Sequence, residues 1–298
     1  MRSPGRRRRA RPVWVAAFAE LCTACGTVTP AEPTPAPSTT REATTEPPTS
    51  VGDEVECLAG EVPFEEEGVI ASFGSVSGDA AAITGFHWTT ETGCERFVVD
   101  LATVNGSPAA SLGSTVVQLR PGSGVLRIEL PAEVAASSVA ETTVDGVLVA
   151  GAYVVRLVDG RLAVDLHLDA PTGLEARSFL VRSPARIVVD LRPEEADPAV
   201  VPPSSTDGLV LVEPREGVAG YPLTVRGYTR LPNPEVVIAL APGTPDRLDL
   251  TPAVAPEGST WTEIEGAAAE GPTGIVELIV EVRAEEDRRR IAVLLDLQ

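Results

Sequence analysis

The chain has 298 residues, of which 43% are hydrophobic, and this is enough to form the cores of two domains of ordinary size. Its formal charge is −19 at pH 7, and because six arginines and one glutamate precede Cys25, removal of that segment takes the charge to −24. A body this acidic repels the phosphates of nucleic acids, so the composition excludes a nucleic-acid partner.

Residues 1–25 have the order of a secretory signal peptide. The start is rich in arginine, a short apolar stretch follows from Val13 to Ala19, and small residues precede Cys25. The apolar stretch is too short to cross a membrane as a helix, so the pattern predicts an exported protein.

The end of this segment, Cys22 to Cys25, resembles the lipobox of bacterial lipoproteins, in which the last cysteine is acylated and becomes the mature N-terminus. The resemblance implies lipidation of Cys25. The leucine that usually lies three residues before that cysteine is here one place earlier, at Leu21, and Glu20 interrupts the apolar run. Ordinary signal cleavage and a misassigned start codon are the alternatives.

Residues 26–52 are dense in Pro, Thr, Ser and Glu and have hardly any large apolar side chains. Such a segment cannot bury enough surface to offset the entropy lost on ordering, so it is predicted to be a disordered tether. Together with a lipidated cysteine, the tether predicts a protein anchored at the outer face of the cytoplasmic membrane.

Two cysteines, Cys57 and Cys94, remain in the exported body. Because thiols outside the cell normally oxidise in pairs, we expect a disulfide between them, worth roughly 4 kcal/mol in the chain-entropy model. Metal binding by two cysteines alone is the less favoured alternative.

Residues 53–193 predict an all-β sandwich, because strand-like runs alternate with turn dipeptides such as Asn105-Gly106 and Asp159-Gly160. A short helical turn within residues 132–140 is the one helical alternative. The expected strands are residues 96–102, 114–119, 125–130, 147–157, 161–168, 176–181 and 186–191.

Three of these strands repeat nearly the same six residues: RFVVDL at 96–101, RLAVDL at 161–166 and RIVVDL at 186–191. Their unequal spacing excludes a solenoid or a propeller. Alternate side chains of a strand point to opposite faces, so each copy is expected to bury its apolar residues and to expose its Arg and Asp to solvent.

Residues 180–191, LVRSPARIVVDL, resemble the closing strand of AMIN domains, and residues 94–101 resemble their opening strand. With the Gly-Phe-His-Trp stretch at 85–88 and the Val-Asp-Gly-Arg-Leu hairpin at 158–162, the pattern is similar to the AMIN-like domains of actinobacterial envelope lipoproteins. The resemblance implies an envelope module, since AMIN relatives recruit cell-wall amidases or bind peptidoglycan. Nothing in the chain resembles an amidase.

Residues 194–207 are rich in Pro and acidic residues and predict a linker to a second β-sandwich, residues 208–298. This second part resembles the immunoglobulin-like domain of spore-germination and envelope proteins, which implies a binding or spacer module. The positions that carry the resemblance are Pro214, Gly217, Pro222, Leu223, Val225 and Gly227. The chain has Pro234-Glu235 where that family usually has a Phe-Glu pair.

No residue pattern predicts catalysis. The chain has no P-loop, no dinucleotide-binding glycine pattern, no HExxH and no nucleophile elbow. Asp165 and His167 share a strand face and could hold a proton or a metal, but a solvated polar face is favoured. Glu65 to Glu67 and Glu194-Glu195 are expected to be solvated carboxylates, with a calcium site as the alternative. We therefore expect no enzyme, metal or cofactor.

Phe86, Trp88 and Tyr153 could form a platform for sugar rings, but core packing is favoured in a chain with so few aromatic residues. Two hypotheses of function remain. The first is a non-catalytic module that binds peptidoglycan or another envelope component, and its ligand-binding residues are unassigned. The alternative is a structural adaptor lipoprotein whose two sandwiches contact another protein.

Overall fold

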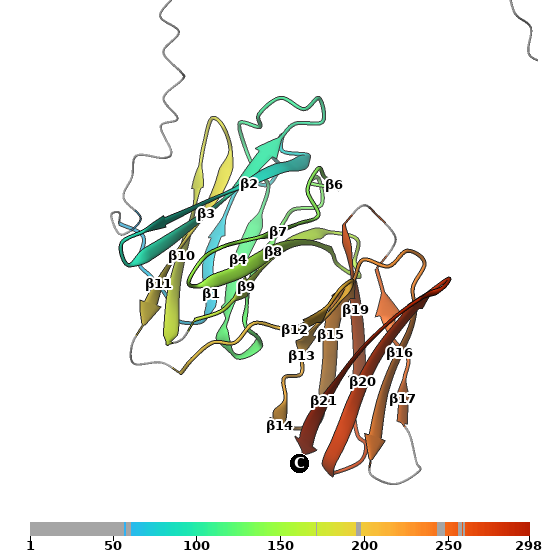
Figure 1. The fold of residues 1–298 in the computed structure, drawn as a ribbon. Helices are drawn as coiled ribbons and strands as arrows, with labels where there is room; N and C mark the ends of the chain where they lie inside the picture. Colours follow the sequence, from blue (N-terminus) through green and yellow to red (C-terminus); the bar gives the residue numbers. More distant parts are fainter. Residues whose placement is uncertain are drawn as a thin grey trace, which may run out of the picture. The chain divides into compact units, whose positions relative to one another are not determined.

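The computed structural model describes residue 57 and residues 61–170, 172–194, 198–242, 248–255, 258 and 260–298, all within one compact unit, residues 50–298. In this part of the chain the only helical element is one 3₁₀ turn, Pro121–Ser123, so the predicted all-β class is confirmed (Figure 1). The described part of the chain contains no helix long and apolar enough to cross a membrane. The signal, Cys25 and the tether lie outside the described residues and stay predictions.

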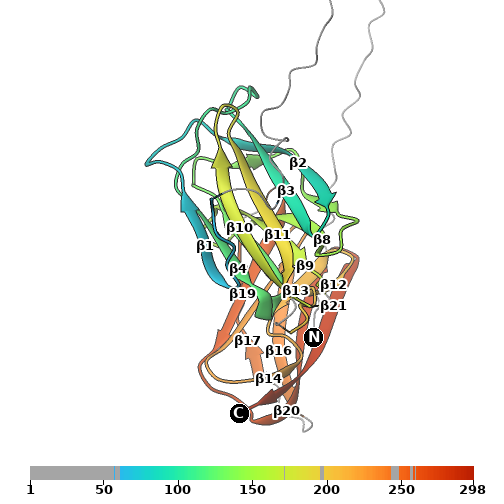
Figure 2. The ribbon, with the colours of Figure 1, turned by 90° about the vertical axis from the view of Figure 1, so that its left-hand side faces the viewer.

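The first sandwich has a five-stranded sheet on one side, which faces the viewer in Figure 2. All pairs in it are antiparallel except the short one between its last two strands. The strand order is β10 (Gly173–Val181), β11 (Arg186–Glu194), β3 (Cys94–Ala102), β2 (Ala82–Glu91) and β6 (Ala136–Ser137).

An 11-stranded sheet lies behind it and continues into the second sandwich. Its first-sandwich strands are, in order, β1 (Gly68–Phe73), β4 (Thr115–Arg120), β5 (Val125–Glu129), β9 (Leu162–Leu168) and β8 (Val149–Arg156), with β7 (Glu141–Thr143) paired to β8. Its second-sandwich strands are β19 (Trp261–Ala268), β15 (Leu223–Thr229), β13 (Leu209–Glu213) and β12 (Ser204–Thr206), with β18 (Ala253–Val254) paired to β19. A short parallel pairing between β8 and β19 joins the two parts.

A third sheet of five strands closes the second sandwich. Its order is β14 (Gly217–Ala219), β21 (Asp287–Leu297), β20 (Gly274–Ala284), β16 (Glu235–Pro242) and β17 (Leu248–Leu250).

Each sandwich has its own apolar core between its two sheets. The inward positions of the repeats, such as Phe97, Val99 and Leu101, are buried in the first core, as the alternation predicts. Residues such as Val225, Ile238 and Leu278 form the second core.

All seven strands expected in residues 96–191 are present, and each end lies within three residues of its predicted position. The helical turn considered for residues 132–140 is wrong. Residues 131–134 form a non-helical turn in which Val134 N–H donates to Pro131 O, and from residue 135 the backbone pairs with β2: Ala135 N–H donates to Ala81 O, and Ser138 N–H donates to Ile83 O, at 3.1 and 3.0 Å. Its short strand, β6, therefore lengthens the sheet.

The segment predicted as a linker contacts the first sandwich. Val200 exchanges two backbone hydrogen bonds with Ala170, and its side chain is buried in the first core. The chain then enters the large sheet at β12, within the same segment. The separate folding of the two sandwiches stays a prediction.

Candidate functional site

The outer face of the five-stranded sheet carries the charged residues of two of the repeats. β3 and β11 are antiparallel, and their register places Arg96 opposite Asp190 and Asp100 opposite Arg186. Arg96 Nε donates to Asp190 Oδ1 at 2.6 Å, and Arg186 Nε lies 2.9 Å from Asp100 Oδ1. The two copies of the repeat thus form two reciprocal ion pairs across one strand pair.

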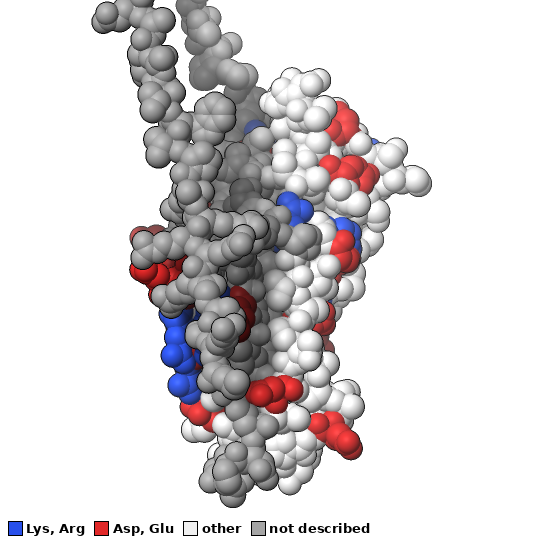
Figure 3. Space-filling model, turned by 90° about the vertical axis from the view of Figure 1, so that its right-hand side faces the viewer, with Lys and Arg blue, Asp and Glu red and all other residues white. Residues whose placement is uncertain are grey.

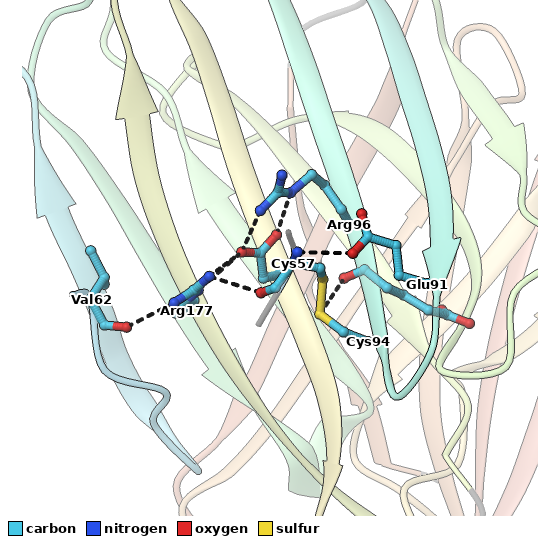
Figure 4. Close-up of a disulfide and its surroundings, with 8 residues drawn as sticks. Cys57, Val62, Glu91, Cys94, Arg96 and Arg177 are labelled. Carbon is cyan, nitrogen blue, oxygen red and sulfur yellow. Dashed lines mark hydrogen bonds and ion pairs between the residues drawn. A yellow bond between two sulfur atoms is a disulfide. The ribbon is translucent and has the colours of Figure 1, made fainter. Parts of the chain in front are cut away.

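The first of these pairs is buried, which overturns the prediction that the Arg and Asp of the repeats face solvent. Asp190 has no exposed surface and Arg96 is only 4% exposed. A strap, residue 57 and residues 61–65, accounts for the burial because it is hydrogen-bonded over this part of the face. Arg177 Nε donates to Asp190 at 3.0 Å, while its Nη2 and Nη1 donate to Cys57 O at 2.8 Å and Val62 O at 3.3 Å (Figure 4).

The expected disulfide between Cys57 and Cys94 is present and ties the strap to the start of β3 (Figure 4). Cys57 N–H also donates to Glu91 Oε2 at 2.9 Å. Further along the strap, the Phe64 ring contacts two guanidinium groups, those of Arg177 and Arg192, at 4.7 and 4.4 Å from its centroid. These contacts cover the half of the face that holds Asp190.

The other half of the face is open. His87 Nε2 lies 2.5 Å from Asp100 Oδ2, so Asp100 contacts both His87 and Arg186. The side chain of His87 is 65% exposed, whereas those of Asp100 and Arg186 are 23% and 22% exposed. Beside them lies a hollow of about 220 Å³ whose walls include Thr84, Pro184, Asp100 and Arg186. We take this group of residues as the candidate site, and name it the Asp100 hollow.

Sequence reasoning named parts of the Asp100 hollow without bringing them together. His87 stood in the Gly-Phe-His-Trp stretch, Asp100 in the first repeat and Arg186 in the third. The repeat itself is the signal that connects Asp100 with Arg186: two antiparallel copies of one Arg-x-x-x-Asp strand, paired in register, bring each Arg to the other copy's Asp.

Asp165, in the second copy of the repeat, is fully buried, so the prediction of a solvated polar face is wrong here as well. Both its carboxylate oxygens accept from Arg127 on β5, at 2.8 and 2.7 Å, and Arg127 also donates to Glu263 on β19 at 3.0 Å. Burial alone would lower the pKa of Arg127, but these two carboxylates outweigh it and raise the pKa above its ordinary value. The face is buried because side chains of the second sandwich, such as Glu263 and Tyr228, pack against it.

His167 is buried in the same region and does not bind Asp165. Its Nε2 is hydrogen-bonded to the hydroxyl of Tyr228 on β15, and its ring lies 4.2 Å from the ring of Tyr153. Burial lowers the pKa of His167 to about 4, and the carboxylate of Asp165 offsets only part of that effect. Burial also raises the pKa of the Tyr228 phenol well above its ordinary value. His167 is therefore a neutral packing residue at neutral pH.

The aromatic residues considered for sugar stacking pack against other side chains. Phe86 and Trp88 contact Phe97 of the first core, at 5.1 and 5.7 Å between ring centroids. Tyr153 packs edge-on against Trp261 at 5.3 Å. All three aromatic residues therefore pack against core side chains, as the favoured interpretation predicts.

The loop carboxylates Glu65, Glu66 and Glu67 are exposed, although the backbone of Glu65 pairs with Ala176 on β10. Glu194 ends β11, and Glu195 lies outside the described residues. In the described ranges no group of three or more His, Cys, Asp or Glu residues could hold a metal ion.

No protein-family model matches the chain, and no curated protein matches it. The AMIN-like and immunoglobulin-like resemblances therefore stay proposals. The Asp100 hollow offers opposite charges side by side at the rim of a small cavity, and such an arrangement can bind a polar group by ion pairs and hydrogen bonds.

Proposed function

We propose that the protein is an exported, lipid-anchored and non-catalytic component of the cell envelope that binds peptidoglycan or another envelope component. In this proposal Cys25 carries the lipid, residues 26–52 form the tether, and the first sandwich is an AMIN-like module within reach of the wall. The second sandwich extends the module or adds a contact.

The observation that carries the proposal is the disulfide between Cys57 and Cys94. Disulfides persist in oxidising compartments outside the cytoplasm, and this one uses both cysteines that follow the signal-like segment. The disulfide lies where the chain enters the first sandwich, and this position supports a folded domain that begins directly after an exported tether.

Charge favours a neutral or cationic partner over an anionic polymer. Acidic side chains are spread over the face shown in Figure 3, and a stripe of basic side chains lies along one border of it. With a formal charge of −24 after Cys25, the chain repels polyanions, and at physiological salt this repulsion is screened over about 8 Å. Peptidoglycan or a protein fits this charge better than a teichoic-acid-like polymer.

The test is a pull-down of purified residues 53–298 with isolated peptidoglycan and, separately, with an envelope protein extract. Retention by the glycan supports the proposal, whereas retention by a protein alone supports the adaptor hypothesis. Hydrolysis of any wall substrate would overturn the non-catalytic assignment.

Anchoring has its own test, because a module can bind the wall without a lipid. Cys25→Ala should release the full-length protein from membranes, with Cys22→Ala as the matched control that stays bound. Unchanged membrane association of the Cys25 variant would remove the lipid anchor. Full-length protein found in the cytoplasm with Met1 intact would remove export altogether.

A further inference from the structure

The Asp100 hollow contains an arginine with spare hydrogen-bonding capacity. Arg186 Nε lies 2.9 Å from Asp100 Oδ1 but is buried without a hydrogen bond, and in the described part of the chain its Nη1 and Nη2 make no hydrogen bond either. The side chain is mostly buried and lines the hollow. A guanidinium edge in this position can bind a carboxylate through two parallel N–H···O bonds.

Asp100 has capacity left as well. A carboxylate offers about four acceptor positions, and Asp100 uses one oxygen toward Arg186 and the other toward His87. The residue opposite Asp100 on β2 is Gly85, and a Cβ placed there would meet only Asp100 Oδ2, at 3.9 Å. The absence of a side chain at Gly85 leaves room beside the carboxylate for a donor group.

The two charges select the kind of ligand. A simple anion on Arg186 would be repelled by Asp100 and by the acidic body, and a simple cation at Asp100 would be repelled by Arg186. A zwitterion has no net charge and can present its carboxylate to Arg186 and its ammonium to Asp100. The hollow is also lined by apolar residues, Pro108, Pro184 and Ala185, which can contact a small aliphatic substituent.

We infer that the Asp100 hollow binds an amino-acid head group, an ammonium and a carboxylate on one carbon that also carries an aliphatic substituent. The inference deepens the proposed envelope function and rests on it for the source of the ligand, a head group at the end of a side chain of a wall peptide, because a residue joined through its backbone keeps at most one of the two charges. A free amino acid has the same chemistry and is the other source that the experiment must separate.

The experiment is an NMR titration of the ¹⁵N-labelled full chain with D-alanine. We expect amide shifts around Asp100, Gly106 and Ala185, and at least tenfold weaker binding of N-acetyl-D-alanine, which lacks the ammonium, and of D-alanine methyl ester, which lacks the carboxylate. Equal binding of the three compounds, or shifts located elsewhere, would overturn the inference.

Variants locate the site. Arg186→Gln and Asp100→Asn should each weaken D-alanine binding at least tenfold, while Arg161→Gln, in an exposed ion pair with Asp159, should leave it unchanged. Since loss of a charge could disturb the sheet, Gly85→Val is the second type of variant: it keeps both charges and introduces a strand-favouring residue, but it fills the space beside Asp100. Unaltered binding by the folded Gly85→Val and Arg186→Gln proteins would contradict the assignment.

Sedimentation with peptidoglycan separates this inference from the proposed function. Wall binding that survives in the Arg186→Gln protein, with no D-alanine binding by the wild type, would reject the inference and keep the envelope function. D-Alanine binding without wall retention would keep the site and assign it to a free amino acid. Loss of both in the Arg186→Gln protein would support a head group displayed on the wall.

Discussion

Arg96 and Asp190 face each other across β3 and β11, and the same two strands repeat the pair in reverse as Asp100 and Arg186. A one-residue slip of this pairing would separate both ion pairs and turn the apolar residues outward. The repeated sequence therefore specifies the register of the two central strands. Asp190 has a second guanidinium partner in Arg177, so it holds together three strands.

Asp190→Asn should destabilise the protein by about 3–5 kcal/mol, because it leaves two buried guanidinium groups without their shared carboxylate. Urea unfolding followed by circular dichroism measures the change in the free energy of unfolding. The matched control is Asp159→Asn, which breaks the exposed pair with Arg161 and should cost about 0.5 kcal/mol or less. Equal losses in the two variants would show that the buried ion pairs of Asp190 contribute no more to the free energy of unfolding than the exposed pair of Asp159.

Seven strands of the first sandwich, β3 to β5 and β8 to β11, could be predicted from sequence because alternation and turn dipeptides are local signals, whereas the sequence patterns do not predict β1, β2, β6 and β7. What the repeats face could not be predicted, since the covering residues are distant in the chain. Arg96 and Asp190 are buried by the strap around Cys57, and Asp165 is covered by a partner from β19, Glu263. Polar residues on one strand face look identical in sequence whether water or a distant part of the chain covers them.

Gly227 is one of the positions that carry the resemblance to the immunoglobulin-like domain, and the structure explains why a glycine is needed there. A Cβ at this position on β15 would lie 2.3 Å from the carbonyl oxygen of Val210 on β13. Gly227→Ala should therefore force the two strands apart and destabilise the protein by roughly 1–3 kcal/mol.

The control for that variant is Gly220→Ala, in the same sandwich, where the nearest heavy atom to a new Cβ is Gln298 O at 4.0 Å. Thermal unfolding of the two variants, compared with the wild type, measures the difference. A Gly227→Ala protein as stable as the Gly220→Ala protein would mean that the β13 and β15 backbones separate without cost.

The Asp100 hollow was only partly predictable. His87, Asp100 and Arg186 belong to three separate strands, and their meeting depends on the register of β2, β3 and β11 as well as on the bulge between Ile83 and Gly85. The open space beside them depends on Pro108 and Pro184, which lie in loops whose course no strand pattern specifies. A search for catalytic motifs passes over such a site.

Removal of the disulfide should loosen the strap more than the sandwich. The double variant Cys57→Ser/Cys94→Ser should lose about 4 kcal/mol of stability and should be cleaved early by protease near residues 57–65. Glu91→Gln is the control, because it alters the acceptor for Cys57 N–H and keeps the bridge, and it should cost about 1 kcal/mol or less. Thiol labelling of the unfolded, unreduced wild type should find neither cysteine free, and labelling of both would show that the bridge does not form.

His167 gives the stability of the protein a specific pH dependence. In the unfolded chain this histidine takes up a proton near pH 6.5, whereas in the folded protein burial against Tyr153 and Tyr228 lowers its pKa to about 4. Between these values the unfolded state binds more protons, so stability falls as the pH falls from 6.5 to 4 and is unaffected by this group above 6.5. The full loss is about 3 kcal/mol.

Urea unfolding at intervals from pH 7.5 to pH 4 measures this loss, but carboxylates titrate in the same range. The comparison that isolates His167 is with His167→Gln, which stays neutral at every pH and keeps a polar group near Tyr228. We expect the Gln variant to be less stable at pH 7.5, because it loses ring packing against Tyr153, and to lose stability less steeply on acidification, so that the two curves converge toward pH 4. Parallel curves would mean that His167 is protonated as readily in the folded protein as in the unfolded chain, and that the second sandwich does not keep this face dry.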